Sequence, residues 1–380
     1  MRTRAAVLYR MEEPPPYARS RPLRVEELEL DGPGPGEVLV EVAHAGLCHS
    51  DLSVIDGSRP RPTPMVLGHE ASGVVRETGQ GVTDVGAGDR VVFSFVPACG
   101  RCVPCASGRP ALCERGAEAN NAGALLGGGR RFRNDDGEVN HLLGVAAFSQ
   151  YTVAAQESLV KLPPDAPLER AALLGCAVLT GVGAVVNTAR VEPGTAVAVF
   201  GLGGVGLCAV MGARLTGATP IVAVDLVEGK LQLARELGAT ATVDAGETAD
   251  PVEAVRELTG GGAHWAFESV GSEQVLAQAY AATRRGGTTV AVGLPHPSKR
   301  LAVPAVTVVA EERTIKGSYM GSAVPRRDIP RLLGLHQAGL LPVDRLVTAV
   351  ITLEDVNPAF DRLAAGEAVR QLVGFDREHA

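Results

Sequence analysis

Four cysteines lie within one short segment of the chain, at a spacing typical of a metal site. They follow the pattern Cys-x2-Cys-x2-Cys-x7-Cys and are Cys99, Cys102, Cys105 and Cys113. Four thiolates fill the tetrahedral coordination sphere of zinc, so the loop 97–114 is expected to hold a structural zinc ion. An iron–sulfur cluster and four core cysteines are the alternatives. Both are disfavoured, because the spacing differs from the common cluster motifs and the loop has few apolar residues.

A second set of metal-binding side chains is spread along the chain. Cys48 lies in Gly-Leu-Cys-His-Ser-Asp, His69 in Gly-His-Glu, and Cys176 in Leu-Gly-Cys. One histidine and two cysteines would supply three ligands and leave a fourth position open, which is the arrangement of a catalytic zinc. Their spacing does not prove that they meet. Taken alone, His69 could be a core histidine and Cys176 a small buried hydrophobic residue.

A glycine-rich motif lies between a predicted strand, 195–200, and a predicted helix, 204–216. It fits G-x-G-x-x-G and consists of Gly201, Leu202, Gly203, Gly204, Val205 and Gly206. In this context the glycines permit a tight turn and let the backbone approach a pyrophosphate at the helix N-terminus. Asp225 ends the next predicted strand, where a carboxylate binds ribose hydroxyls and repels a 2′-phosphate. The motif therefore predicts NAD rather than NADP, with a helix cap as the alternative role of Asp225.

The elements that must position these residues change in character along the chain. Up to about residue 164, short apolar runs separated by turn signals predict a β-rich region, in which the polar segment 127–138 is expected to be a surface loop. From about residue 193, strands alternate with helix-length segments, as in a parallel sheet. The six expected strands are 195–200, 221–225, 241–243, 265–268, 288–292 and 314–317. Helices are expected at 228–237, 328–338 and 357–365, and a final strand at 369–375.

Composition limits the class of protein. A chain of 380 residues suits two domains, and a net charge of -7 offers no broad basic surface for nucleic acid. The N-terminal segment is charged throughout, and no apolar run reaches the ~18 residues of a membrane span. Seven cysteines, an odd number, make a poor disulfide framework. A cytoplasmic protein with no nucleic-acid or membrane partner is therefore expected.

These motifs together resemble the zinc-containing medium-chain alcohol dehydrogenase family, which includes the liver-type enzymes. The matching segments are 48–51, 68–70, the four-cysteine loop, 175–176 followed by Thr180-Gly181, the glycine motif and 366–370. The resemblance implies an α/β fold with a GroES-like β-rich catalytic domain over 1–177, to which residues 321–380 return. It also implies a Rossmann domain over 178–320, with a doubly wound parallel six-stranded sheet.

The resemblance also implies roles for individual residues. Cys48, His69 and Cys176 would bind the catalytic zinc, which Glu70 could approach, while Asp51 would orient the histidine. Ser50 would take the proton of the alcohol; the histidine that follows three residues later in many relatives is replaced here by Ser53. The cofactor would contact His49, Thr180, the glycine motif, Asp225, Lys230, Val292 and Arg370, with His49 and Arg370 facing the pyrophosphate.

The implied activity is reversible hydride transfer between a primary or secondary alcohol and NAD, with zinc stabilising the alkoxide. About two zinc ions per chain are expected, one catalytic and one structural. Phe95, Leu142 and Leu294 would line an apolar pocket for a small alcohol or aldehyde. The long segment between Cys113 and Ser149 resembles that of the longer, dimeric members of the family more than the shorter, tetrameric ones, which implies a homodimer in which residues 303–309 could form the edge.

Three other functions remain open. The first is a formaldehyde dehydrogenase that uses glutathione or another thiol, although Gly57 and Ala117 stand at the approximate positions of its characteristic charged residues. The second is a non-catalytic redox sensor that binds zinc and NAD. The third is a zinc-independent quinone or enoyl reductase. The complete set of metal-binding residues argues against the last two, because neither function needs an open metal position.

Overall fold

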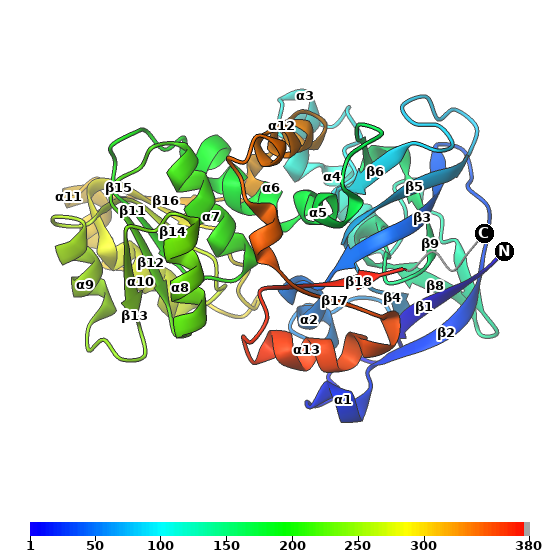
Figure 1. Ribbon diagram of the computed structural model, residues 1–380, viewed down its shortest axis with the longest axis horizontal. Helices are drawn as coiled ribbons and strands as arrows, with labels where there is room; N and C mark the ends of the chain where they lie inside the picture. The colour runs from blue at the N-terminus through cyan, green and yellow to red at the C-terminus, as the bar shows by residue number, and fades with distance from the viewer. Residues whose placement is uncertain (376–380) are drawn as a thin grey trace. The chain divides into compact units, whose positions relative to one another are not determined.

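The computed structural model describes residues 1–375, and the chain folds into two compact units (Figure 1). The first unit comprises Met1–Cys176, Val324–Gly334 and the chain from Val343 onward. The second comprises Ala177–Ala323 and Leu335–Pro342. The first unit is thus assembled from segments near both ends of the sequence.

A small closed barrel forms one part of the first unit. Its strands, in order around the barrel, are β1 (Arg2–Leu8), β2 (Leu23–Leu30), β7 (Phe132–Asn134), β8 (Gly137–His141) and β4 (Met65–Val66). Phe132 and Val139 are fully buried in a core cluster with Leu28 and Leu30. The segment 127–138, expected to be a surface loop, lies mostly at the surface but contains β7, the start of β8 and the core side chain of Phe132, so the expectation of a loop is wrong.

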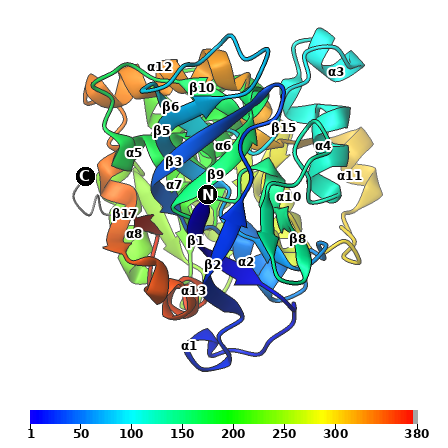
Figure 2. The same cartoon turned by 90° about the vertical axis from the view of Figure 1, so that its right-hand side faces the viewer.

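A seven-stranded sheet forms the other part of the first unit, and Figure 2 shows several of its strands side by side. Its order is β10 (Leu159–Lys161), β6 (Arg90–Phe93), β5 (Glu70–Thr78), β3 (Glu37–Gly46), β18 (Arg370–Gly374) and β17 (Val347–Ile351), with β9 (Tyr151–Ala155) paired to β3. Leu372 of β18 pairs with Gly46 of β3, so the last strand joins the sheet built by the start of the chain.

Short helices complete the first unit. They are α1 (Tyr17–Ser20), α2 (His49–Ile55), α3 (Val103–Ala106), α4 (Glu114–Asn121), α5 (Leu168–Ala172), α13 (Val356–Ala364) and the part of α12 (Pro325–Gln337) up to Gly334. Among them, α5 packs against β3, β5 and β6. The apolar face of α13 buries Val356, Phe360 and Leu363.

The second unit is built on an all-parallel sheet. Its order is β13 (Ala241–Asp244), β12 (Ile221–Asp225), β11 (Val197–Phe200), β14 (Ala263–Glu268), β15 (Thr283–Ala291) and β16 (Thr314–Gly317). The central strand β11 is a continuous apolar run, Val-Ala-Val-Phe, and every residue in it is buried. Such runs are typical of parallel strands that are covered by helices on both faces. Each of the six strands overlaps an expected one, although β15 begins at Thr283 rather than at 288, and the predicted doubly wound fold is confirmed.

Two pairs of helices pack against this sheet, α7 with α8 and α9 with α10. The helices of the second unit are α6 (Ala177–Gly183), α7 (Gly204–Leu215), α8 (Glu228–Leu237), α9 (Pro251–Leu258), α10 (Glu273–Ala282) and α11 (Ala305–Ala310). Asp250 caps α9 by accepting hydrogen bonds from two backbone N–H groups, and Pro251 begins that helix. Gly238 ends α8 with a φ of 126°, as the sequence predicts.

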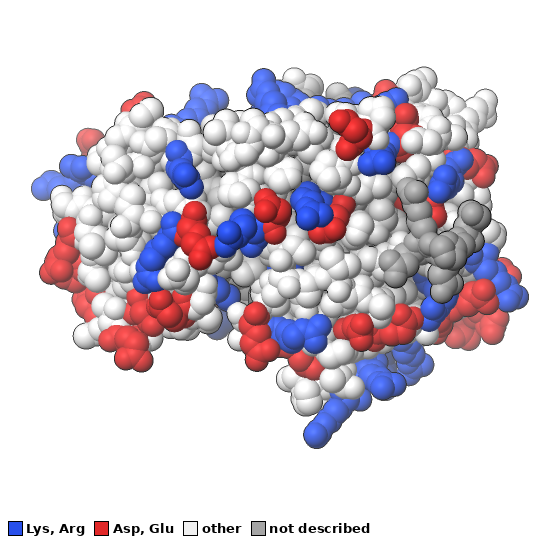
Figure 3. All heavy atoms as spheres, in the orientation of Figure 1, with Lys and Arg blue, Asp and Glu red and all other residues white. Residues whose placement is uncertain are grey.

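Acidic and basic side chains are interspersed on the face of the molecule shown in Figure 3. Within residues 1–375, no single helix has the length and apolarity of a membrane span, although the bent pair Leu168–Gly175 and Ala177–Ala189 meets those criteria by length and composition alone.

Candidate active site and metal centres

Cys48, His69 and Cys176 meet in the interior of the first unit. Their ligand atoms all lie within 4.8 Å of one another, and the three residues are 6%, 1% and 5% exposed. The Cys176 Sγ to His69 Nε2 distance is 3.5 Å. Typical zinc–sulfur and zinc–nitrogen bond lengths give about 3.6 Å for this edge of a tetrahedral site. The donor set therefore fits a zinc ion held by three protein ligands.

The sheet of the first unit brings these three distant residues together. Gly46 on β3 pairs with Glu70 on β5, so the turns that carry Cys48 and His69 leave the same end of two neighbouring strands. Cys176 follows the 3₁₀ turn Leu173–Gly175, which packs against β5 and β6. A Cβ at position 175 would lie 2.0 Å from the carbonyl oxygen of Phe93. Only glycine allows this close approach to β6, which places Cys176 beside the other two residues.

Asp51 organises the site from the first turn of α2. Its carboxylate accepts hydrogen bonds from the backbone N–H of Cys48 at 3.2 Å and of Gly68 at 3.0 Å. It also lies 3.1 Å from Nδ1 of His69 and is completely buried. A carboxylate is an acceptor, so it holds the proton of His69 on Nδ1 and leaves the lone pair of Nε2 directed at the sulfurs.

Burial and neighbouring groups shift the pKa values of the site in both directions. A hydrogen bond from Cys176 lowers the pKa of Cys48 well below its ordinary value, against the opposing effect of burial. Burial raises the pKa of Glu70 to about 7, although Arg370 acts in the opposite direction. The Nε of Arg370 is 3.6 Å from Oε1 of Glu70. Both carboxylate oxygens of Glu70 are buried without a hydrogen-bond partner among the described residues, as expected beside a positive ion.

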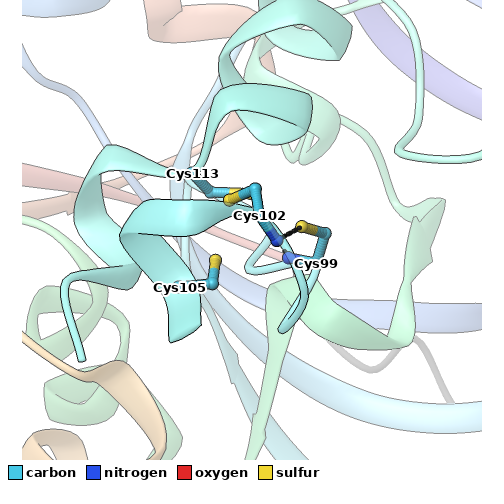
Figure 4. Close-up of side chains that lie close together, drawn as sticks. All are labelled: Cys99, Cys102, Cys105 and Cys113. Atoms are coloured by element: carbon cyan, nitrogen blue, oxygen red, sulfur yellow. Dashed lines mark hydrogen bonds between the residues drawn. The ribbon is translucent and has the colours of Figure 1, made fainter. Parts of the chain in front are cut away.

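The four-cysteine loop forms a second and separate cluster, shown in Figure 4. The sulfurs of Cys99, Cys102, Cys105 and Cys113 all lie within 4.8 Å of one another. The sulfurs of Cys102 and Cys113 are 3.9 Å apart, close to the ~3.8 Å edge of a zinc tetrathiolate. The backbone N–H of Gly116 donates to Cys113 Sγ at 3.3 Å. Four sulfurs around one point leave no position for a substrate, so this cluster fits a structural zinc.

The glycine motif of the second unit adopts the conformation that the sequence predicts. Gly201 has a φ of 88°, and Gly203 precedes the first turn of α7. A Cβ at position 206 would lie only 1.8 Å from the carbonyl oxygen of Gly201, so glycine is required there. The N–H groups at the start of α7 follow this turn directly, which is the usual site for a dinucleotide pyrophosphate.

Asp225 lies next to this motif at the end of β12. Its Oδ2 accepts from the N–H of Leu202 at 2.6 Å, and its Oδ1 accepts from Leu226 and Val227. Helix α8 begins at Glu228 with Val227 as its N-cap, and no side chain caps it. Asp225 therefore contacts the glycine motif and does not cap the helix.

The remaining predicted cofactor residues are divided between the two units. His49 and Arg370 belong to the first, at the starts of α2 and β18. Thr180 on α6, Lys230 on α8 and Val292 after β15 belong to the second. Ser50 lies on α2 between His49 and the buried Asp51.

The comparisons with known proteins cover both units. The description "Alcohol dehydrogenase GroES-like domain" matches residues 34–164, and "Zinc-binding dehydrogenase" matches residues 204–338. A Mycobacterium tuberculosis protein named "Putative alcohol dehydrogenase D" is 42% identical over 98% of this chain and 100% of its own length. The chain belongs to the zinc-containing medium-chain alcohol dehydrogenase family. The predicted family, fold class and oxidoreductase class are thereby confirmed, and zinc and NAD are the typical cofactors of this family.

Two further relatives of this dehydrogenase have more specific names. An S-(hydroxymethyl)glutathione dehydrogenase from Synechocystis is 36% identical over 99% of this chain and 100% of the relative. The crystal structure of benzyl alcohol dehydrogenase from Acinetobacter calcoaceticus superposes with a TM-score of 0.91 at 34% identity, covering 99% of this chain and 100% of that chain. The names differ in substrate, so the relatives agree on the family and leave the substrate open.

Sequence reasoning missed one polar residue of this dehydrogenase beside the glycine motif. Glu268 ends β14 and is 1% exposed. The signal was available, because Glu268 ends a predicted strand just as Asp225 does.

Of the three predicted pocket residues, Phe95 lies edge-on to the ring of His69, with ring centroids 5.7 Å apart. Leu142 is buried, whereas Leu294 is exposed and belongs to the second unit.

Proposed function

We propose that this dehydrogenase catalyses reversible hydride transfer between a primary or secondary alcohol and NAD. The observation that carries the proposal is the meeting of Cys48, His69 and Cys176 within 4.8 Å. Three protein ligands leave one tetrahedral position for a substrate oxygen, whereas a purely structural zinc uses four. Asp225 beside the glycine motif supports NAD as the cofactor.

The metal, the cofactor and the side chains of the site would each have a separate role. Bound zinc would supply a Lewis acid for the alcohol oxygen, and bound NAD would accept the hydride. Asp51 fixes the proton of His69 on Nδ1, which raises the basicity of Nε2. The burial of all three ligands, with the ring of Phe95 against His69, excludes water and strengthens electrostatic interactions in the site.

Ser50 is proposed to accept the proton of the alcohol. Because positioned acid–base groups contribute roughly 10²- to 10⁴-fold, Ser50→Ala is expected to lower kcat for alcohol oxidation by about 10²-fold or more. Steady-state kinetics would measure the loss, with metal analysis to show that zinc is retained. Ser53→Ala, on the same helix, serves as the control and is expected to stay within a few-fold of the parent. Near-normal turnover of Ser50→Ala would rule out this proton route.

Asp225 is proposed to select NAD over NADP. Because a charged hydrogen bond contributes about 1.5–3 kcal/mol, Asp225→Ser is expected to shift the ratio of kcat/KM for the two cofactors toward NADP by roughly 10²-fold. Asp244→Ser is a matched control, since Asp244 pairs with Asp225 in register but its carboxylate binds the N–H groups of Gly246 and Glu247. An unchanged preference in Asp225→Ser, or an equal shift in the control, would contradict the assignment.

The substrate class can be decided by following NADH absorbance with zinc-loaded protein. The panel should contain aliphatic alcohols, benzyl alcohol, and formaldehyde with and without glutathione. Turnover of free alcohols supports the proposed function. The 36% identity to an S-(hydroxymethyl)glutathione dehydrogenase favours a thiol-adduct substrate as the second candidate, and activity only in the presence of thiol would establish it. Binding of zinc and NADH without any turnover would favour a redox sensor.

We also propose that the protein is a homodimer. Strand β16 is an edge strand of the parallel sheet, and all of its residues are exposed. Val306 and Val309 on the adjacent α11 are 69% and 81% exposed. A second copy of the same edge would pair these open backbone groups and cover the apolar side chains. Size-exclusion chromatography with light scattering measures the mass, and a tetramer or monomer would contradict this proposal.

A further inference from the structure

Glu268 stands at the topological switch point of the parallel sheet. The sheet order β13-β12-β11-β14-β15-β16 places β14 next to β11, although the chain visits β12 and β13 between them. In open parallel sheets, ligands bind outside the carboxyl ends of the two strands at such a point. Glu268 is the last residue of β14, and its register partners Phe200 and Ala291 are the last residues of β11 and β15.

The side chain of Glu268 binds the loop that follows it. Its Oε1 accepts hydrogen bonds from the backbone N–H of Val270 at 2.7 Å, of Gly271 at 2.6 Å and of Ser272 at 3.4 Å. Burial raises the pKa of Glu268, and these three N–H groups act in the opposite direction. A buried carboxylate held by N–H groups alone is costly for the fold. Its position at the switch point indicates a role beyond stability.

The main chain of Glu268 binds a second loop. Its carbonyl oxygen accepts from the N–H of Val292 at 2.8 Å and of Gly293 at 2.9 Å, directly after β15. A Cβ at position 293 would lie 3.0 Å from Oε2 of Glu268. One residue therefore fixes the loops that leave the carboxyl ends of both β14 and β15.

The first of these loops contacts the glycine motif. The hydroxyl of Ser269, the residue after Glu268, donates to the carbonyl oxygen of Gly201 at 2.8 Å. The same hydroxyl would lie 2.7 Å from a Cβ at position 206. A displacement of residues 269–272 would therefore change the packing of the turn that receives the pyrophosphate.

We propose that Glu268 is a positioning residue for the dinucleotide: its carboxylate holds the loop after β14 and, through Ser269, the glycine motif in the shape that binds NAD, beside the β15 loop that its main-chain carbonyl binds. The proposal rests on the NAD-dependent function proposed above. The carboxylate acts through the loop after β14, so its loss should weaken cofactor binding and leave the chemical step of the bound complex unchanged.

The test is a fluorescence titration of the zinc-loaded enzyme with NADH. Glu268→Ala removes the acceptor, and since three charge-assisted hydrogen bonds are lost, the Kd for NADH should rise by about tenfold or more. Glu268→Gln keeps the size and one acceptor oxygen, and the Kd should rise by about threefold. In both variants KM for NAD should follow Kd, while kcat at saturating NAD stays within about twofold.

Thr259→Val is the matched control for stability. The buried Thr259 hydroxyl accepts the N–H of Gly262 at 3.1 Å in the loop before β14, at the opposite end of the same strand. The Thr259→Val substitution should lower the thermal midpoint of unfolding but leave the affinity for NADH unchanged. The proposal would be overturned by parent-like Kd values for NADH in both Glu268 variants, or by an equal rise of Kd in Thr259→Val. If Glu268→Ala does not fold, the Kd of Glu268→Gln decides. A parent enzyme that fails to bind NADH would refute the proposed function instead.

Discussion

His69→Ala is expected to leave the dehydrogenase with about one zinc ion per chain instead of about two, and to reduce alcohol oxidation by at least about 10³-fold. Of the three clustered ligands, only Cys48 and Cys176 would remain in this buried site. The four-cysteine cluster, which is a separate group of ligands, should keep its metal. Metal analysis by mass spectrometry and steady-state kinetics measure the two effects.

A graded variant and a control make this result specific. Asp51→Asn keeps all three ligands but weakens the hold on Nδ1 of His69, and a loss of about 10- to 100-fold in zinc affinity or activity is expected. His141→Gln replaces another fully buried histidine of the first unit, whose Nε2 accepts the N–H of Arg131, and should keep both ions. Full zinc content and turnover in His69→Ala would remove the basis of the proposed function.

Cys105→Ser is expected to release the other zinc ion and to lower the thermal midpoint by on the order of 10 °C, because structural zinc contributes directly to folding free energy. The sulfurs of the cluster are held close together in a loop with only short helices around them. Activity per folded molecule should fall only a few-fold, since the catalytic ligands are separate. Differential scanning calorimetry with metal analysis tests this prediction.

Cys208→Ala provides the control for cysteine replacement. Cys208 is buried in α7 of the second unit and belongs to neither metal-binding cluster. Its replacement should keep about two zinc ions and shift the midpoint by a few degrees at most, as expected for a small buried side chain. If Cys105→Ser retained both its zinc and its midpoint, the four-cysteine loop would have no structural metal.

Local patterns in the sequence were sufficient where the interacting residues are close in the chain. The four cysteines span fifteen residues, so short loops alone bring their sulfurs together. The glycine motif lies between one strand and one helix, and the close approach of Gly206 to the carbonyl oxygen of Gly201 is an interaction within six residues. The apolar runs of β11 and β12 likewise identify buried parallel strands from composition.

Interactions between distant residues could not be read in the same way. The segment 127–138 is polar, yet it contributes to β7 and β8, because β7 pairs with β2 and β8 with β4, both far away in the sequence, and Phe132 packs in the core of the barrel. Strand β15 begins at Thr283 rather than at 288, where its pairing with β14 is irregular. In both cases the partner that stabilises the strand lies outside the local sequence.

The sequence alone determined the four-cysteine loop, a dinucleotide turn with its acid, and six parallel strands, because each of these is a local pattern of residue types. Only the tertiary structure decided that Cys48, His69 and Cys176 meet, with Cys176 lying 107 positions from His69. It also decided that Asp51 holds the histidine and that Glu268 binds one loop through its carboxylate and a second through its carbonyl oxygen. The physical reason is that strand pairing and the close packing at Gly175 set the distances between these residues. The partner residues in both interactions cannot be identified from the neighbouring sequence.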